Sequence, residues 1–177
     1  ETFRTLNNNE IRKLNDIAKK YNIKYQNKHK LDLVDEILSN VDVIPNSIVL
    51  AQAAIESGWG KSRFAKEYNA LFGEYTYDDS EGVIPLEREN GDTHLIKAFS
   101  SYSNSVESYF DNINSHYAYE DFRDIRNIMR KRNNFSNVNL LVNKLSTYAE
   151  DENYIKTIRQ VIKTNNFAIF DQKTISY

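Results

Sequence analysis

The residues with special backbone geometry are confined to one part of the chain. The sequence has 177 residues, and all of its glycines, both prolines and its only tryptophan lie between residues 45 and 91. Glycine permits left-handed backbone and close approach, whereas proline fixes φ. We therefore expect irregular structure in this window and regular elements on either side. The residues concerned are Gly58, Gly60, Gly73, Gly82, Gly91, Pro45, Pro85 and Trp59.

Apolar residues recur at helical spacing before, at the start of and after this window. The spacing predicts helices over residues 10–21, 31–38, 47–56, 103–113, 119–131, 137–148 and 151–162. The basic residues of one helix are expected at a solvated end, where positive charge complements the helix dipole; they are Arg126, Arg130, Lys131 and Arg132. The fold class that follows is mainly α (α+β). We expect a single domain over residues 1–177, with residues 1–41 forming an N-terminal helical extension that packs on the rest.

Composition excludes several classes of function. Without cysteine, the chain has no thiol nucleophile, disulfide or cysteine-based metal site. Lys and Arg total 23 and Asp and Glu total 25, so the formal net charge of -2 gives no basic excess for nucleic acid. No apolar run approaches the ~18 residues of a membrane span. The first residue is Glu1 and no signal-like stretch follows it, so we expect any targeting segment to lie outside this chain.

Metal and nucleotide chemistry lack their usual motifs. The three histidines, His29, His94 and His116, are far apart and show no metal-ligand spacing. No glycine-rich phosphate loop follows a predicted strand, and no Gly-x-Ser-x-Gly nucleophile motif occurs. We therefore expect no metal and no cofactor.

The helix predicted after Asn46 ends in a carboxylate. Asn46 is a suitable N-cap, and the apolar residues that follow mark a buried helix that closes at Glu56. Apolar neighbours and the negative end of the helix dipole both disfavour an ionised carboxyl at this place. Glu56 is thus a candidate general acid. The alternative is a last-turn residue that reaches solvent or pairs with Lys61 or Arg63.

Trp59 follows this helix between two glycines. A tryptophan beside a carboxylate could belong to the core. It could also form the wall of a sugar-binding cleft, where its flat apolar face stacks on a pyranose ring. The pattern leaves both interpretations open.

Asn90-Gly91 is a strong hairpin signal between two runs typical of strands, residues 83–89 and 92–99. A two-residue turn predicts the pairs Glu89–Asp92, Glu87–His94 and Pro85–Ile96. One side of the ribbon would then carry three acids and a histidine, as a solvated surface or as the wall of a cleft. The other side would pack inward through Ile84, Leu86, Thr93 and Leu95.

An acid at a helix end and a second carboxylate on a hairpin form the pair that glycoside hydrolysis uses. One protonates the leaving oxygen. The other activates water or stabilises the oxocarbenium-like transition state.

The residues around Glu56 belong to a longer pattern, Leu50-Ala51-Gln52-Ala53-Ala54-Ile55-Glu56-Ser57-Gly58-Trp59-Gly60, followed by Ser62, Phe64, Ala65 and Asn69-Ala70-Leu71-Phe72-Gly73. This pattern resembles the signature of the bacterial peptidoglycan glucosaminidases of glycoside hydrolase family 73. The later motifs are similar to its Bax-like branch. They are Gly82-Val83-Ile84-Pro85 with Arg88, Gly91, His94 and Phe99, then Ser105-Val106-Glu107-Ser108-Tyr109, Asn112-Ile113-Asn114, Ala118-Tyr119 with Phe122-Arg123, and Tyr148-Ala149-Glu150-Asp151 with Tyr154.

The resemblance covers about residues 45–163 and implies a lysozyme-like helical domain with a small β-hairpin lobe flanking a cleft. It implies that Glu56 is the general acid and that a hairpin glutamate assists, with Glu87 the best match and Glu89 the alternative. Tyr148 would lie in the cleft near the scissile linkage. Trp59 and Phe72 would shape the sugar sites, and Glu89 and His94 would contact substrate from the hairpin.

The function that the resemblance implies is cleavage of the β-1,4 bond after N-acetylglucosamine in peptidoglycan glycan strands, in the bacterial cell envelope. The substrate's own acetamido group offers a route that needs no second carboxylate. Two other hypotheses stay open: a lytic transglycosylase, in which one acid suffices and an anhydro ring forms, and a non-catalytic glycan-binding module.

Overall fold

The computed structural model describes residues 6–85, 93–134 and 137–171. The contacts within the chain divide it into two compact units. The first unit comprises Glu1–Val43 and Asp111–Asn137, and the second comprises Ile44–Phe110 and Val138–Tyr177. The two N-terminal helices therefore share a unit with a later segment of the region that carries the family motifs.

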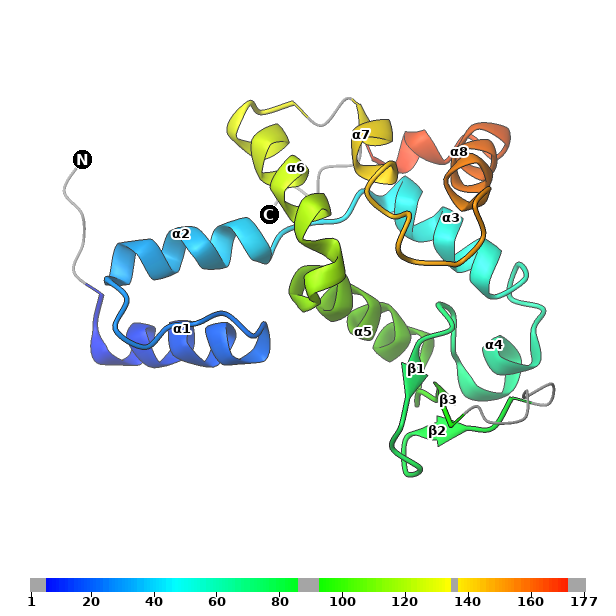
Figure 1. Cartoon of the computed structure of the whole chain (residues 1–177), viewed down its shortest axis with the longest axis horizontal. Helices are drawn as coiled ribbons and strands as arrows, with labels where there is room; N and C mark the ends of the chain where they lie inside the picture. Colours follow the sequence, from blue (N-terminus) through cyan, green and yellow to red (C-terminus); the bar gives the residue numbers. More distant parts are fainter. Residues whose placement is uncertain (1–5, 86–92, 135–136, 172–177) are drawn as a thin grey trace. The chain divides into compact units, whose positions relative to one another are not determined.

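The first unit is helical. It contains α1 (Asn8–Lys20), α2 (Lys30–Asn40), the end of α5 (Tyr102–Ser115), the short 3-10 helix η1 (Tyr117–Tyr119) and α6 (Glu120–Lys131) (Figure 1). Asn7 caps α1: its side chain accepts from the Glu10 amide at 3.0 Å, and the Glu10 carboxylate accepts from the Asn7 amide at 2.8 Å. A small core of Ala18, Ile23, Leu33 and Ile37 holds α1 against α2.

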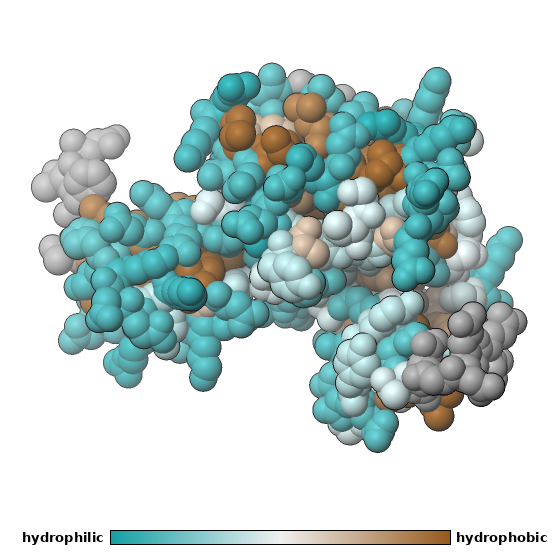
Figure 2. All heavy atoms as spheres, in the orientation of Figure 1, coloured by the Kyte–Doolittle hydropathy of each residue, from teal (hydrophilic) through white to brown (hydrophobic). Residues whose placement is uncertain are grey.

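The apolar stripes predicted for these two helices are only partly buried. Ala18, Leu33 and Ile37 lie in the core, but Ile17, Leu31 and Leu38 are exposed. Over α1 and α2, the face drawn in Figure 2 is mainly hydrophilic, with apolar side chains between the polar ones. A short helix buries only the face that meets its neighbours, α2 for α1 and both α1 and α6 for α2, which is why the predicted stripes were too wide.

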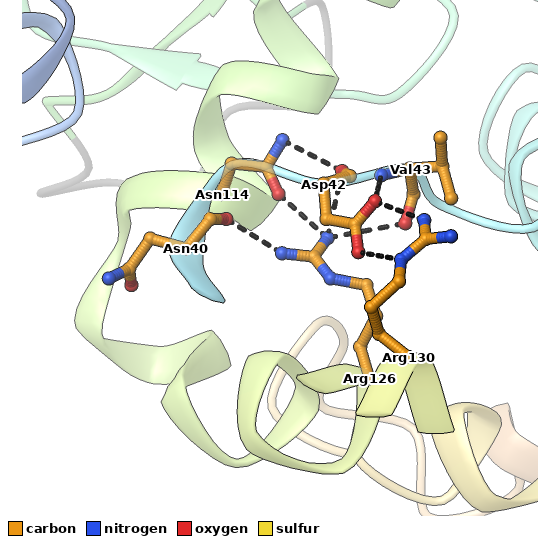
Figure 3. Close-up of polar contacts among 6 residues, drawn as sticks. All are labelled: Asn40, Asp42, Val43, Asn114, Arg126 and Arg130. Atoms are coloured by element: carbon orange, nitrogen blue, oxygen red, sulfur yellow. Dashed lines mark hydrogen bonds and ion pairs between the residues drawn. The ribbon is translucent and has the colours of Figure 1, made fainter. Parts of the chain in front are cut away.

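Arg126 is fully buried in α6, which corrects the prediction that it lies at a solvated helix end. It lies one helical turn after the buried Phe122, on the same face of the helix. Its guanidinium donates to the backbone carbonyls of Asn40 at 2.6 Å and Asp42 at 3.0 Å, and to Asn114 Oδ1 at 2.7 Å (Figure 3). Burial lowers the pKa of Arg126 to about 10, so the group still carries its charge at neutral pH.

Arg130 lies one turn further along α6 and pairs with the Asp42 carboxylate, with 2.9 Å between Nε and Oδ2 (Figure 3). It is half exposed, and Lys131 and Arg132 are exposed, so the prediction of a solvated end holds for these three residues.

The second unit contains α3 (Asn46–Glu56), α4 (Arg63–Tyr68), most of α5, α7 (Val138–Val142), α8 (Tyr154–Thr164) and the 3-10 helix η2 (Phe167–Phe170). Helix α3 packs against both α8 and η2. The helix predicted over 137–148 is shorter than expected, and α4 was not predicted.

The start of α3 also differs from the prediction. Its N-cap position is Pro45, and Asn46 is the first helical residue. A backbone amide at this end that has no partner within the helix bonds to a distant part of the chain: Ser47 N–H donates to Asp171 Oδ1 at 2.8 Å. The Asn46 side chain donates to the Phe170 carbonyl at 2.9 Å.

The irregular window and the residues just after it form a three-stranded antiparallel sheet of β1 (Tyr75–Thr76), β2 (Gly82–Val83) and β3 (Leu95–Lys97), in the order β1-β3-β2. Strand β1 was not predicted. Ile96 pairs with Val83 and not with Pro85, so the predicted register is wrong by two residues. A shift of two keeps each residue on its predicted side of the ribbon. The predicted Asn90-Gly91 turn and the Glu89–Asp92 pair lie outside the described residues.

The inward face of this ribbon is smaller than predicted. Leu95 is buried as expected, whereas Ile84 and Thr93 are exposed and Leu86 lies outside the described residues. Gly82 allows β2 to pack closely, because a Cβ at this position would lie only 2.5 Å from Cβ of Leu95. In the described part of the chain, no helix combines the length and the apolar character that crossing a membrane requires.

The buried Arg126 gives a stability prediction. Lysine cannot reach the same set of acceptors, since it lacks the planar fork of the guanidinium. We expect Arg126→Lys to lower the free energy of unfolding by about 3 kcal/mol, measured by urea denaturation followed by circular dichroism. Arg130→Lys is the matched control on the same helix and should cost less than ~1 kcal/mol, because that pair is half exposed. Equal losses in the two variants would contradict a special role for Arg126.

Candidate active site

Glu56 is the last residue of α3, as the sequence predicted. The next turn is tight: Gly58, Trp59 and Gly60 all have positive φ, at 56°, 60° and 70°. Two hydrogen bonds close it, from Trp59 N–H to the Ala54 carbonyl at 2.7 Å and from Gly60 N–H to Ser57 Oγ at 2.8 Å. The two glycines adopt this backbone without strain, whereas Trp59 is held in it by the turn.

The environment of Glu56 favours its protonated form. The side chain is half-buried, and burial raises the pKa of its carboxyl. The hydroxyl of Tyr154 donates to Glu56 Oε1 at 2.7 Å, which offsets part of that rise by stabilising the carboxylate. A group of this kind can hold a proton closer to neutral pH than an exposed glutamate can, which is what a general acid requires.

The alternative in which Glu56 pairs with Arg63 is not observed. Arg63 Nη2 donates to the Ile84 carbonyl at 3.2 Å, and Nη1 lies 3.9 Å from the Glu67 carboxylate. Lys61 is exposed.

Buried polar side chains of the second unit form a chain of hydrogen bonds that leads to Glu56. Gln52 lies one turn earlier on the same face of α3, and its Nε2 donates to Tyr154 Oη at 2.9 Å. Tyr109 of α5 donates its hydroxyl proton to Gln52 Oε1 at 2.6 Å. Three segments far apart in sequence are thereby connected to one carboxyl group.

The loop before β1 passes the other oxygen of this carboxyl. Gly73 has a φ of 62°, and a Cβ built on it would lie 3.9 Å from Glu56 Oε2. Phe72, just before it, is almost fully buried, with its ring 4.1 Å from that of Tyr109. Phe72 therefore supports this loop from the core, and its ring is not open to a sugar.

Tyr148 lies in the same cluster but makes a different contact. Its hydroxyl donates to the Phe72 carbonyl at 3.0 Å, and its ring stacks on Tyr154 with the two planes 3° apart. The hydrogen bond to Glu56 thus comes from Tyr154, while Tyr148 holds the loop that leads to Gly73.

Two of the predicted sugar-binding residues are accessible. Trp59 is 55% exposed, and its ring is tilted against that of Phe167 with 6.4 Å between the centroids, which favours the interpretation of a surface ring over a core residue. His94 is half-buried, and its ring lies 4.2 Å from that of Tyr75. Glu87 and Glu89, the two candidates for the second acid, lie outside the described residues.

Sequence reasoning missed the roles of Gln52, Tyr109 and Gly73 around Glu56. One signal could have found the first: a glutamine in an otherwise apolar helix, four residues before the candidate acid, must lie on the same face. It also missed Glu74, whose Oε2 accepts from the Ser108 hydroxyl at 2.9 Å. Across residues 6–85, 93–134 and 137–171, no group of three or more histidine or acidic side chains is arranged to hold a metal ion.

Comparison with known proteins identifies the family. The model of the Glucosaminidase family, described as mannosyl-glycoprotein endo-beta-N-acetylglucosaminidase, matches residues 31–167. The chain belongs to this family, which confirms the prediction made from its motifs.

Two curated relatives show the extent of the similarity. Protein bax of Escherichia coli (strain K12) is 35% identical over 137 residues, which is 77% of this chain and 48% of that protein. Peptidoglycan hydrolase FlgJ of Escherichia coli O157:H7 is 35% identical over 92 residues, 46% of this chain and 29% of that protein. The chain thus spans about half or less of the length of these relatives.

Two solved structures share the fold. The catalytic domain of the autolysin Auto from Listeria monocytogenes aligns with a TM-score of 0.53 and 17% identity, covering 96% of this chain and 91% of that one. N-acetylmuramoyl-L-alanine amidase from Staphylococcus aureus aligns with a TM-score of 0.55 and 22% identity, covering all of this chain and 50% of that one. The fold is mainly α and lysozyme-like with a small sheet, as predicted.

Removal of the Tyr154 hydroxyl tests the electrostatics of the site. Tyr154→Phe keeps the ring that stacks on Tyr148 and deletes the donor to Glu56. Because that hydrogen bond lowers the pKa of Glu56 against the effect of burial, we expect the pKa to rise further in the variant. A pH titration followed by infrared absorption of the carboxyl group measures it, with Glu56→Gln to assign the signal. A titration unchanged by Tyr154→Phe would contradict the contact.

The raised pKa of Glu56 also predicts how stability depends on pH. Between the ordinary pKa of glutamate and the raised value, the folded state binds more protons than the unfolded state, so stability falls as pH rises through this window. Glu56→Gln carries no charge there. We therefore expect its melting temperature to exceed that of the wild type above the window, with the advantage vanishing below the ordinary pKa. Glu152→Gln, at an exposed carboxylate, is the control, and its melting temperature should show no such pH-dependent difference from the wild type.

Proposed function

We propose that this chain is a peptidoglycan hydrolase that cleaves the β-1,4 bond after N-acetylglucosamine, with Glu56 as the general acid. The observation that carries the proposal is the half-buried Glu56 carboxyl at the end of α3, whose pKa is raised by burial and which accepts a hydrogen bond from Tyr154. Membership of the Glucosaminidase family and the relative named peptidoglycan hydrolase support the substrate class.

In the proposed reaction, Glu56 transfers its proton to the glycosidic oxygen as the bond from that oxygen to C1 breaks. The bonding electron pair stays on the leaving oxygen, and positive charge develops on the ring. Water then adds to C1 and gives up one proton. Glu87, or Glu89 as the alternative, stabilises the positive charge or accepts the proton from water, unless the substrate's acetamido group takes the place of the second carboxylate.

The exposed face of Trp59 is proposed to stack on a sugar ring beside Glu56. Tyr148 is proposed to act by holding the loop next to Glu56, through the hydrogen bond from its hydroxyl to the Phe72 carbonyl. His94 and Glu89 are proposed to contact substrate from the lobe, and Phe72 to shape the sugar site from beneath.

The region that carries the family motifs, residues 45–163, is proposed to act as the catalytic part of a single domain, with residues 1–41 as a helical extension. A substrate of this kind places the chain in the bacterial cell envelope. Catalysis by carboxyl groups requires neither metal nor cofactor.

Glu56→Gln tests this function directly. The amide keeps the size of the side chain and can still accept from Tyr154, but it has no acidic proton to give. We expect the release of fragments from purified peptidoglycan to fall by about 10²–10⁴-fold, measured by chromatography of the soluble products. Glu152→Gln, at an exposed position, is the control and should release fragments at the wild-type rate.

Mass spectrometry of the same products separates the alternatives. Reducing N-acetylglucosamine ends support hydrolysis as proposed, whereas anhydro-muramyl ends would assign the chain to the lytic transglycosylases. Binding to the wall without release of fragments would indicate a glycan-binding module. Near-normal activity of Glu56→Gln would overturn the assignment of the acid.

A further inference from the structure

Two buried polar residues near Glu56 have no part in the proposed reaction itself. Gln52 and Tyr109 have no exposed surface. An amide or a phenol in such a place is costly unless it is hydrogen-bonded. Both are bonded to a chain of contacts that ends at the Glu56 carboxyl, so their effect on that group can be followed bond by bond.

These hydrogen bonds run in one direction, from Tyr109 through Gln52 and Tyr154 to Glu56. Tyr109 gives its single hydroxyl proton to Gln52 Oε1, so the carbonyl side of the amide faces Tyr109. The NH₂ side must then face Tyr154, and it donates to Tyr154 Oη. An amide NH₂ group can only donate a hydrogen bond, so the hydroxyl proton of Tyr154 cannot point back toward Gln52.

The single proton of Tyr154 therefore points to Glu56 Oε1. Burial and the adjacent Glu56 carboxylate raise the pKa of Tyr154, so the hydroxyl keeps its proton over the whole working range. Oε1 is thus always an acceptor. When Glu56 is protonated, the proton belongs on Oε2, the oxygen that lies beside Gly73, 3.9 Å from where a Cβ of that residue would be.

We propose that Gln52 and Tyr109 are positioning residues that hold Tyr154 as a permanent donor to Glu56 Oε1 and thereby keep the acidic proton on Oε2. This inference rests on the proposed role of Glu56 as the general acid. After the proton has left Oε2, the same donor stabilises the carboxylate that remains. The chain of hydrogen bonds thus favours both the correct placement of the proton and its departure.

The other titratable groups around this chain come from the neighbouring elements. Tyr148 stacks on Tyr154 from the segment after α7, and its hydroxyl is bonded to Phe72. Glu74 follows Gly73 in the loop, and its carboxylate accepts from Ser108 of α5. Neither of these two hydrogen bonds involves Gln52 or Tyr109.

Tyr109→Phe and Gln52→Leu are the test variants, since neither side chain touches substrate in the proposed reaction. Tyr109→Phe frees the amide of Gln52 to turn over, and Gln52→Leu removes it. In both variants Tyr154 is no longer held as a donor to Glu56. We expect kcat on peptidoglycan to fall on the order of 10-fold with KM unchanged, because a hydrogen bond to a charged group is weakened. The basic limb of the pH–kcat profile should move to higher pH.

A readout independent of activity separates this proposal from the proposed function. The infrared titration of the Glu56 carboxyl, assigned by its absence in Glu56→Gln, should move to higher pH in both variants. Ile158→Val is the control: it trims a fully buried side chain of α8 outside the hydrogen-bond chain, and should lower the melting temperature without moving the titration. Tyr154→Phe should move the titration in the same direction, so the test survives if one variant does not fold.

An unmoved titration in folded Tyr109→Phe and Gln52→Leu would overturn the positioning role. If the titration moves but Glu56→Gln stays active, Glu56 is not the general acid. The hydrogen bonds from Gln52 and Tyr109 would then position Tyr154 without any effect on the reaction. If Ile158→Val lowers kcat by the same factor, Gln52 and Tyr109 act only through the packing of the core.

Discussion

A carboxyl group that is half removed from water needs a fixed hydrogen-bond donor, and the second unit is arranged around that requirement. Glu56 has its donor in Tyr154, which is held by Gln52, which is held in turn by Tyr109. These bonds join α3, α8 and α5, segments that are up to 102 residues apart in sequence. The contacts that set the acidity of Glu56 are therefore also contacts that hold the helices of this unit together.

The first unit also removes an ionisable group from water, in this case a cation. Arg126 is fully buried, and its two terminal nitrogens donate mainly to backbone carbonyls between Asn40 and Val43, whereas its Nε has no hydrogen-bond partner among the described residues (Figure 3). The nearby Asp42 carboxylate is bonded to Arg130. A buried charge is stable when several acceptors converge on it, and here the last residue of α2 and the irregular segment after it provide them, because these carbonyls are not used within a helix.

Much of the fold was predictable because it depends on local patterns. Apolar spacing located most of the helices, and the change from an apolar helix to Ser57 and Gly58 located the end of α3 at Glu56. The failures concern elements that local patterns do not determine. Strand β1 has only two residues and exists because it pairs with β3, and the register of β2 depends on that same small sheet. The burial of Arg126 depended on acceptors more than 80 residues away.

The sequence by itself determined the family, the helical class of the fold and the identity of the candidate acid, because these follow from residue types at fixed short spacings. Only the tertiary structure decided what surrounds that acid. It assigned the donor to Tyr154, directed the hydroxyl of Tyr148 to the Phe72 carbonyl and brought Gly73 next to Oε2. The physical reason is that burial and hydrogen-bond direction arise from side chains that meet only when distant segments pack, and no spacing along the chain encodes that meeting.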